Sequence, residues 1–141
     1  DVYKRQAEHT AYVELRRILG LARREIYVVD PYMDETIFTL LKTAAKPDLC
    51  VRLLASKHPP DFQLEATKFE KEFRGVQVEI RKCKDFHDRF IILDQKLCFH
   101  LGASIKDAGG RAFMISQVEE VAIVNALLSF TIEKWKTATL F

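Results

Sequence analysis

The segment around residue 87 holds the residues of this sequence that are best suited to chemistry. His87 and Arg89 stand two positions apart at the start of an apolar run that favours a strand over residues 88–94. Side chains two apart on a strand project from the same face, so we expect the imidazole and the guanidinium to lie side by side. Phosphodiester chemistry uses such a pair, because a neutral imidazole can attack phosphorus while a cation offsets charge on the non-bridging oxygens. From spacing alone, a histidine with only a structural hydrogen bond is the more common case.

Basic residues are denser around this segment than elsewhere in the chain. They are Arg81, Lys82, Lys84 and Arg89 before or on the strand, and Lys106 and Arg111 after it. Such clustering favours an anionic ligand. The candidate phosphate contacts are Lys84, Arg89, Lys106 and Arg111. The alternative is a solvated charged rim balanced by Asp85, Asp88 and Asp107, and the formal net charge of +2 does not decide between them.

Metal and nucleotide chemistry are both disfavoured by the pattern. Asp85, His87 and Asp88 could be drawn as metal ligands, but adjacent residues on a strand point in opposite directions. No glycine is followed by the Lys-Ser or Lys-Thr of a phosphate-binding loop. We therefore expect no metal and no cofactor. The other histidines are His9, His58 and His100, and each is expected to be structural or solvated.

Alternating helix and strand patterns must position these residues. Periodicity and capping predict helices over residues 7–20, 34–45, 61–73 and 118–136, with Asp34 as the N-cap of the second. The apolar face of the last helix is expected to be Val121, Val124, Leu127, Leu128, Ile132 and Trp135. Strands are predicted over residues 25–30, 50–56, 76–81, 88–94, 96–101 and 112–116. This alternation predicts an α/β fold, a mixed sheet of about six strands with helices on both faces.

The composition indicates one globular domain over residues 1–141. Hydrophobic residues make up 48% of the chain, too many for a disordered protein, and the length is too short for two full-sized domains. No apolar stretch approaches the roughly 20 residues that a membrane span needs. Three cysteines without zinc-type or redox-type spacing favour a reducing, cytoplasmic compartment. The chain begins at Asp1, with no initiator Met and no signal segment, which is compatible with a fragment of a longer protein.

The same segment resembles the signature of the phospholipase D-like (HKD) superfamily of phosphodiesterases and nucleases, H-x-K-x4-D followed by G-S-x-N. His87, Arg89 and Asp94 fall at the H, K and D spacings, and Gly102-Ala103-Ser104-Ile105 follows. The element order and the strand that ends at Asp30-Pro31-Tyr32 extend the resemblance over nearly the whole chain. Residues 86–90 and 102–107 also resemble a variant of this signature that is found in uncharacterised bacterial and prophage proteins. The resemblance implies a phospholipase D-like fold, metal-independent chemistry, and catalytic roles for His87, Arg89, Asp94 and Ser104.

Three departures from that signature bear on activity. Arg89 replaces the family's Lys, which keeps the charge and adds a planar fork suited to phosphate. Ala103 occupies the usual Ser position, so Ser104 is the nearest hydroxyl, and Ile105 or Lys106 stands where Asn is expected.

The third departure concerns the acid that orients the histidine in active members. The nearest candidates in this sequence are Glu119 and Glu120. Without a carboxylate on its second nitrogen, His87 would be a poorer nucleophile.

The family reaction resembles a two-histidine mechanism, and this chain carries one motif. The resemblance therefore implies a homodimer in which a two-fold axis brings both His87 side chains together. The preferred function is a degenerate domain that binds a phosphodiester, nucleic acid or nucleotide in preference to lipid. One alternative is an active, metal-independent nuclease or phosphodiesterase that uses His87 as nucleophile. The other is a dimerisation or regulatory module with a vestigial site.

Overall fold

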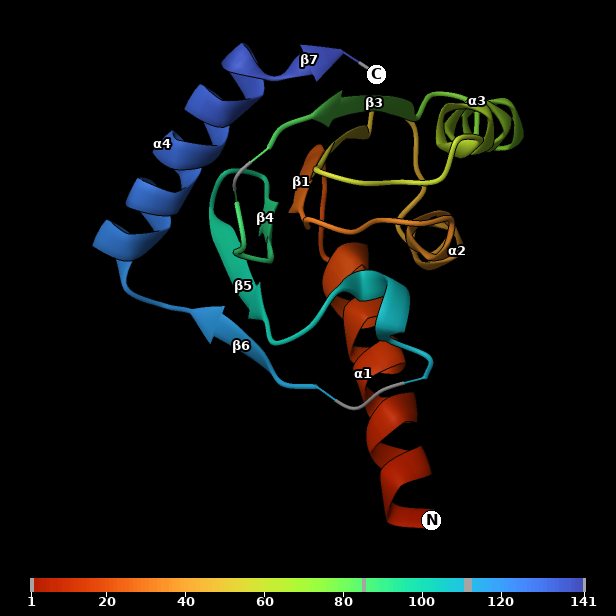
Figure 1. Cartoon of the computed structure of the whole chain (residues 1–141), viewed down its shortest axis with the longest axis vertical. Coiled ribbons are helices and arrows are strands. Elements are labelled where there is room, and N and C mark those ends of the chain that lie inside the picture. The colour runs from red at the N-terminus through yellow and green to blue at the C-terminus, as the bar shows by residue number, and fades with distance from the viewer. Residues whose placement is uncertain (1, 85, 111–112, 141) are drawn as a thin grey trace.

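A computed structural model describes residues 2–84, 86–110 and 113–140, which build one mixed sheet between helices (Figure 1). The strand order is β6-β5-β4-β1-β2-β3-β7. The strands are β1 (Glu25–Val29), β2 (Cys50–Ala55), β3 (Gln77–Lys82), β4 (Phe90–Leu93), β5 (Leu97–Leu101), β6 (Ile115–Val118) and the two-residue β7 (Thr139–Leu140). All but β7 are predicted by the sequence, so the expected α/β sheet is confirmed.

One half of the sheet is parallel and the other is antiparallel. β1, β2 and β3 run in the same direction, and α2 (Thr36–Leu41) and α3 (Phe62–Glu72) supply the crossovers that parallel neighbours need. β4 lies antiparallel to β1, and β5 and β6 continue in alternating directions. We call the end of the sheet where β1 to β3 finish and β4 begins the carboxyl end. The opposite end, where β4 finishes, is the amino end.

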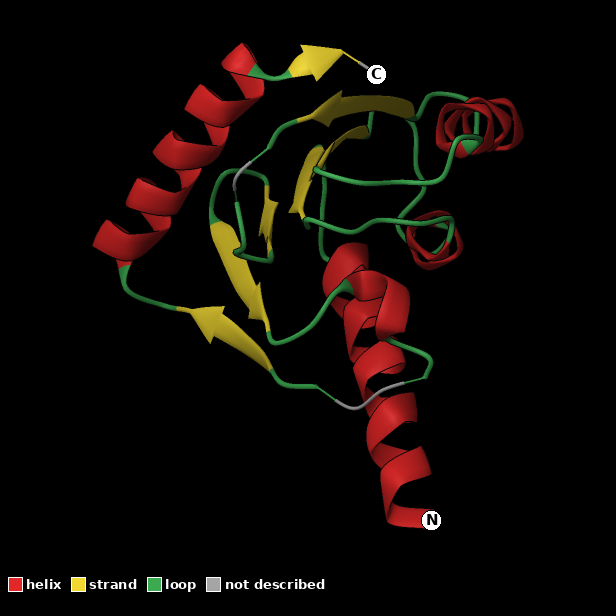
Figure 2. Ribbon diagram, in the orientation of Figure 1, coloured by secondary structure: helices red, strands yellow, loops and turns green. Residues whose placement is uncertain are grey.

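Helices cover both faces of the sheet, as expected. α1 (Val2–Gly20), α2 and α3 lie on one face, and α4 (Val121–Thr137) lies on the other (Figure 2). Strand alternation builds the two cores: Ile26 and Val28 of β1 face α1 to α3, whereas Tyr27 and Val29 face α4. None of the helices in the described part of the chain combines the length and the hydropathy that a membrane crossing requires.

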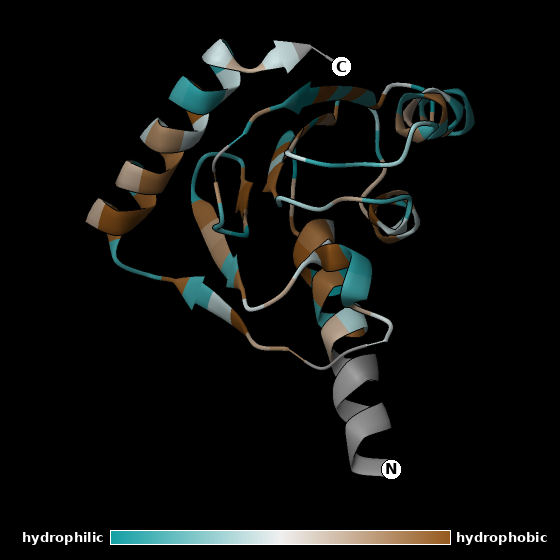
Figure 3. Cartoon of the chain, viewed as in Figure 1, coloured by the Kyte–Doolittle hydropathy of each residue, from teal (hydrophilic) through white to brown (hydrophobic). Residues whose placement is uncertain are grey.

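α4 is attached to the sheet mainly near its C-terminal end. Trp135 packs edge-on against Tyr27, with ring centroids 6.0 Å apart, and lies under the Arg81 guanidinium at 4.6 Å. Arg81 Nη1 also donates to the Trp135 carbonyl at 2.6 Å. Apolar residues recur along α4 (Figure 3), but Val121, expected on its buried face, is 71% exposed. That part of the predicted face is wrong, whereas Val124 and Trp135 are buried and Leu127, Leu128 and Ile132 pack against the same core.

Several element boundaries differ from the predictions. The helix expected over 34–45 extends only from Thr36 to Leu41, and its N-cap residue is Glu35 instead of Asp34. The Asp34 side chain still contributes at the start of the helix, because its Oδ1 accepts the Thr36 N–H at 2.9 Å. The first helix begins earlier, at Val2, and the strand expected from residue 88 begins at Phe90. The last strand is shifted from 112–116 to Ile115–Val118, and Ala112 lies outside the described residues.

Candidate functional site

Asp30 and Arg89 lie on neighbouring strands at the carboxyl end of the sheet. Val29 of β1 pairs with Phe90 of β4, so Asp30 and Arg89 are the next residues along that register. Strand alternation directs both side chains to the face that carries α1 to α3. The segment after β5 reaches the same place, because the Leu101 N–H donates to the Arg89 carbonyl at 2.9 Å.

The buried carboxylate of Asp30 is the centre of a hydrogen-bond network at this end. Asp30 is 0% exposed. Its Oδ1 accepts bonds from Ser104 Oγ at 2.9 Å and from the Tyr32 N–H at 3.1 Å. Its Oδ2 accepts the Ile105 N–H at 2.7 Å. Arg89 Nε donates to Ser104 Oγ at 3.0 Å and lies 3.9 Å from Asp30 Oδ1, so Ser104 links the guanidinium to the carboxylate.

Burial is the largest influence on the Asp30 carboxyl, and it raises the pKa above the ordinary value. The N–H groups of Ile105 and Tyr32, the Ser104 hydroxyl and the Arg89 charge act in the opposite direction without cancelling it. A buried carboxylate stripped of such partners is strongly destabilising. The Ser104 hydroxyl and the Arg89 cation are therefore among the partners that stabilise the ionised Asp30 carboxyl, together with the N–H groups of Ile105 and Tyr32.

Arg89 is held on one side of its guanidinium only. Nε is bound to Ser104, and no described residue accepts a hydrogen bond from the two Nη groups. The side chain is 29% exposed. A guanidinium has several N–H donors in one plane, so the Nη groups can meet two oxygens of one phosphate while Nε stays on Ser104.

His87 lies outside β4, in the segment 83–89 that connects β3 to β4. The strand begins two residues later than predicted, so the alternation argument does not place His87 beside Arg89 on one strand face. Its side chain is exposed, and it forms no hydrogen bond or ion pair with a described residue. The segment leaves β3 at the carboxyl end, where Ser56 Oγ donates to the Cys83 carbonyl at 2.9 Å. His87 and Arg89 therefore belong to the same end of the sheet.

The predicted phosphate contacts have different surroundings. Lys84 is exposed in the same connecting segment as His87. Lys106 lies in the 3-10 turn η1 (Ile105–Asp107), and its Nζ is 3.1 Å from Asp107 Oδ1. Arg111 lies outside the described residues. Of the predicted phosphate contacts that the structure describes, Arg89 is the one that forms a hydrogen bond with Ser104.

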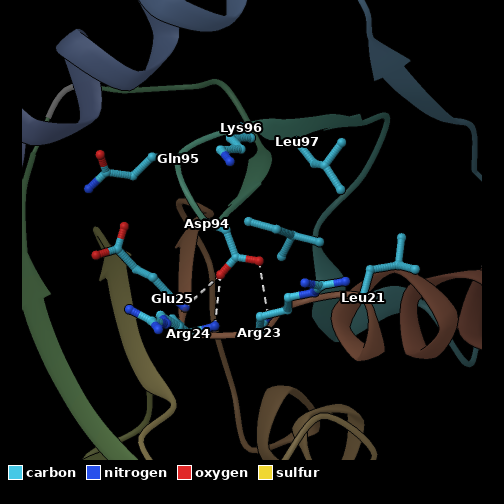
Figure 4. Close-up of a pocket in the computed structure, with 9 residues that line it drawn as sticks. Leu21, Arg23, Arg24, Glu25, Asp94, Gln95, Lys96 and Leu97 are labelled. Atoms are coloured by element: carbon cyan, nitrogen blue, oxygen red, sulfur yellow. Dashed lines mark hydrogen bonds between the residues drawn. The ribbon is translucent and has the colours of Figure 1, made fainter.

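Asp94 is not part of this group. It follows β4 at the amino end, in a turn in which Asp94 and Gln95 have φ of 53° and 58°. Its Oδ2 accepts the Arg23 N–H at 2.9 Å, and its Oδ1 accepts the N–H groups of Arg24 and Glu25 at 2.8 and 3.0 Å (Figure 4). The carboxylate therefore ties the α1–β1 loop and the start of β1 to the β4–β5 turn, at the end of the sheet opposite Arg89.

Desolvation, the largest single influence on the Asp94 carboxyl, acts to raise its pKa. The three N–H donors from Arg24, Arg23 and Glu25 and the Lys46 charge outweigh it, and the pKa is lowered. A cavity of about 640 Å³ lies beside this carboxylate, at the far end of the sheet from Arg89.

Glu119 and Glu120, the candidate orienting acids, also lie at the amino end. They follow β6, whose last residue, Val118, pairs with Cys98 near the start of β5. The start of β5 is beside the end of β4, so both glutamates are separated from Arg89 by the length of the strands. Neither glutamate is therefore placed to orient a histidine at the carboxyl end of the sheet.

His58 and His100 remain outside the network. His100 pairs with Phe90 in the β4–β5 register, and alternation turns it to the sheet face opposite Arg89. The His58 ring stacks on Phe62 with centroids 5.2 Å apart, and its Nδ1 lies 3.2 Å from the Pro59 carbonyl. The side chain of His9 lies outside the described residues.

Asp30 is the site residue that the sequence reasoning missed, because it was taken only as the end of a strand. A signal was present: an ionisable residue that directly continues a buried apolar strand must find partners. The sequence does not say which residues those are.

Comparison with known proteins identifies the fold. No protein-family model and no curated protein sequence matches the chain. Among solved structures, NucT from Helicobacter pylori is 13% identical with a TM-score of 0.69, over 95% of this chain and 92% of NucT. Nuc from Salmonella typhimurium, a phospholipase D family member, is 14% identical with a TM-score of 0.70, over 92% and 89%. TrmBL2, an archaeal chromatin protein with a novel mode of DNA binding, is 16% identical with a TM-score of 0.64; the alignment covers 93% of this chain and 50% of TrmBL2.

The placement of Asp94 predicts a structural role with a definite pH dependence. Asp94→Ala should lower the free energy of unfolding by about 1–3 kcal/mol near neutral pH, because three N–H groups lose a charged acceptor. A lowered pKa in the folded state gives stability that is present above the unfolded value, about 3.9, and lost as the pH falls through the folded value. The deficit of Asp94→Ala against wild type in urea denaturation should therefore shrink below about pH 4. Asp88→Ala, which removes an exposed carboxylate, is the control; an undiminished deficit at low pH would contradict the argument.

Proposed function

The chain has the phospholipase D-like fold, and from this premise we propose that it binds a phosphodiester ligand, nucleic acid or nucleotide, through Arg89. The observation that carries the proposal is the chain of contacts from Asp30 through Ser104 to Arg89. Asp30 is 0% exposed and Arg89 is partly exposed, so the carboxylate orients the guanidinium from behind. Orientation before binding reduces the entropy that a flexible arginine would otherwise lose on meeting a phosphate.

The local charge supports an anionic ligand. One hydrogen bond from Nε goes to a neutral hydroxyl, which leaves the Nη donors for phosphate oxygens. Lys84 and Lys57 add exposed ammonium groups at the carboxyl end of the sheet. TrmBL2, whose fold is similar over half of its length, is described as binding DNA. We therefore favour nucleic acid as the ligand.

Weak or absent catalysis is the second part of the proposal. The buried carboxylate at this end is bound to Ser104, Ile105 and Tyr32, and Glu119 and Glu120 follow β6 at the opposite end. Loss of the carboxylate partner of a catalytic histidine costs about 10⁴-fold in rate in other enzymes. One observation favours the alternative, an active enzyme: the His87 imidazole is exposed at the end of the sheet that carries Arg89.

The third part is a homodimer. A two-histidine reaction, or a ligand clamped from two sides, needs a second copy of His87 and Arg89. A two-fold axis through the carboxyl end of the sheet would supply it.

Removal of the guanidinium should weaken ligand binding. Arg89→Ala is expected to lower the affinity for a labelled single-stranded oligonucleotide about 10- to 100-fold, since charge-assisted hydrogen bonds are lost. Arg89→Lys should lose less, because it keeps the charge beside Asp30. The measurement is fluorescence anisotropy across a salt titration, with thermal unfolding to verify folding. Arg24→Ala, an exposed arginine at the amino end, is the matched control; equal affinities for Arg89→Ala and wild type would remove Arg89 from the site.

In solution the chain should be a dimer at micromolar concentration. Multi-angle light scattering should give twice the 16.3 kDa of one chain. A strictly monomeric species would exclude the shared two-histidine site, and with it the enzyme alternative.

Any phosphodiesterase activity should be slow, resistant to chelators and dependent on His87. The assay is oligonucleotide cleavage in excess EDTA by wild type and His87→Ala, with acid-labile phosphohistidine sought in the steady state. Fast, chelator-resistant cleavage that His87→Ala abolishes would favour the enzyme alternative. Chelator-sensitive cleavage that survives in His87→Ala would contradict a histidine mechanism.

A further inference from the structure

Tyr32 and Lys57 form an exposed pair of an aromatic ring and a cation at the carboxyl end of the sheet. The Tyr32 side chain is 43% exposed. Lys57 is also exposed, and its Nζ lies 5.9 Å from the centre of the Tyr32 ring. The two residues come from the segments that follow β1 and β2, so this pair is on the same end of the sheet as Arg89.

Backbone hydrogen bonds fix the position of the pair. Tyr32 and Lys57 form an isolated parallel β-bridge. The Pro31 carbonyl accepts the N–H groups of Ser56 and Lys57 at 3.1 and 2.9 Å, and the Met33 N–H donates to the Lys57 carbonyl at 3.0 Å. A ring carried on such a backbone loses little conformational freedom when it stacks on a ligand.

Asp30 Oδ1 connects the Tyr32–Lys57 pair to the Arg89 guanidinium. Asp30 Oδ1 accepts both the Tyr32 N–H and the Ser104 hydroxyl, and Ser104 Oγ accepts Arg89 Nε. β1 lies between β4 and β2 in the sheet. The backbones of Arg89 and Lys57 are therefore on opposite sides of Tyr32, about two strand spacings or ~10 Å apart.

We infer that Tyr32 and Lys57 form a stacking platform for an unpaired base of single-stranded nucleic acid, with Lys57 and Arg89 contacting the phosphates on its two sides. An aromatic ring accepts any base on its face, and flanking cations follow the backbone. The interior of a duplex offers no free base face, so a single strand suits the platform better. The inference rests on the proposed function and adds the class of nucleic acid to it.

The experiment compares strands with and without bases. Anisotropy of a labelled oligodeoxythymidine of about 16 nucleotides is measured beside an abasic strand of equal length and a duplex. Tyr32→Ala should weaken binding of the oligodeoxythymidine about 5- to 100-fold and leave the abasic strand unchanged. Tyr32→Phe should restore binding, because it keeps the ring. Lys57→Gln should weaken binding of both the oligodeoxythymidine and the abasic strand. It should also reduce the slope of log affinity against log salt concentration by about the amount that one phosphate contact contributes.

The matched control is a second pair of the same chemistry, on the other face of the sheet. Phe130 of α4 is 36% exposed, and Lys134 Nζ lies 5.7 Å from the centre of its ring. Phe130→Ala should bind all three nucleic acids as wild type does. Thermal unfolding verifies that each variant is folded.

Two results would overturn stacking on Tyr32 and leave the proposed function of Arg89 intact. If Tyr32→Ala binds oligodeoxythymidine like wild type while Arg89→Ala loses it, the ring has no role and the Arg89 site stands. If Tyr32→Ala weakens the abasic strand as much as the oligodeoxythymidine, the effect is not stacking. If Arg89→Ala binds normally while Tyr32→Ala does not, stacking on Tyr32 is supported, but the Arg89 site and the phosphate contact assigned to Arg89 are wrong. If wild type binds no strand, both are wrong.

Discussion

The hydrogen bonds of one buried carboxyl group, that of Asp30, hold together the segments that meet at the carboxyl end of the sheet. Among the residues that the structure describes, Asp30 is the only fully buried acid. Ser104 and Ile105, two of its partners, are 74 and 75 residues away in sequence. Water cannot solvate the group, so these partners must meet its oxygens whenever the chain is folded. The positions of the turn after β1, the start of β4 and the 3-10 turn after β5 follow from that requirement.

A second carboxylate performs the corresponding task at the amino end, by different means. Asp94 holds three backbone N–H groups of the α1–β1 loop and needs no particular side chain opposite it. Asp30 also accepts two backbone N–H groups, from Tyr32 and Ile105. It differs in accepting a side-chain hydroxyl, that of Ser104, which connects it to the Arg89 guanidinium. At the carboxyl end a partly exposed guanidinium is therefore joined to the buried carboxylate, whereas at the amino end the carboxylate joins a loop to a turn. Arg81, from the basic cluster of the sequence, is likewise used for packing, since it lies on Trp135 and binds Glu79.

Local patterns in the sequence were enough to predict the sheet, the helices and their order. The run 25–30 has the length and β-branched composition of a central strand, and 50–56 is a short apolar run of similar length. The site was predicted only in part. Arg89 and Ser104 were both expected, but their link to Asp30 depends on the register of β1 against β4, which no local pattern contains. The spacing that matched Asp94 to the family signature says nothing of a left-handed turn that directs its carboxylate to a distant loop.

The dependence of Asp30 on its partners changes what a motif match can mean in proteins of this kind. Selection for a folded domain alone would keep a cation at position 89 and a hydroxyl at position 104, whether or not any bond in a ligand is ever broken. Two of the four signature positions can therefore persist in a lineage that has lost its chemistry, and Asp94 can persist through its own loop. His87 is exposed and forms no hydrogen bond or ion pair with a described residue, so folding places no such constraint on this position.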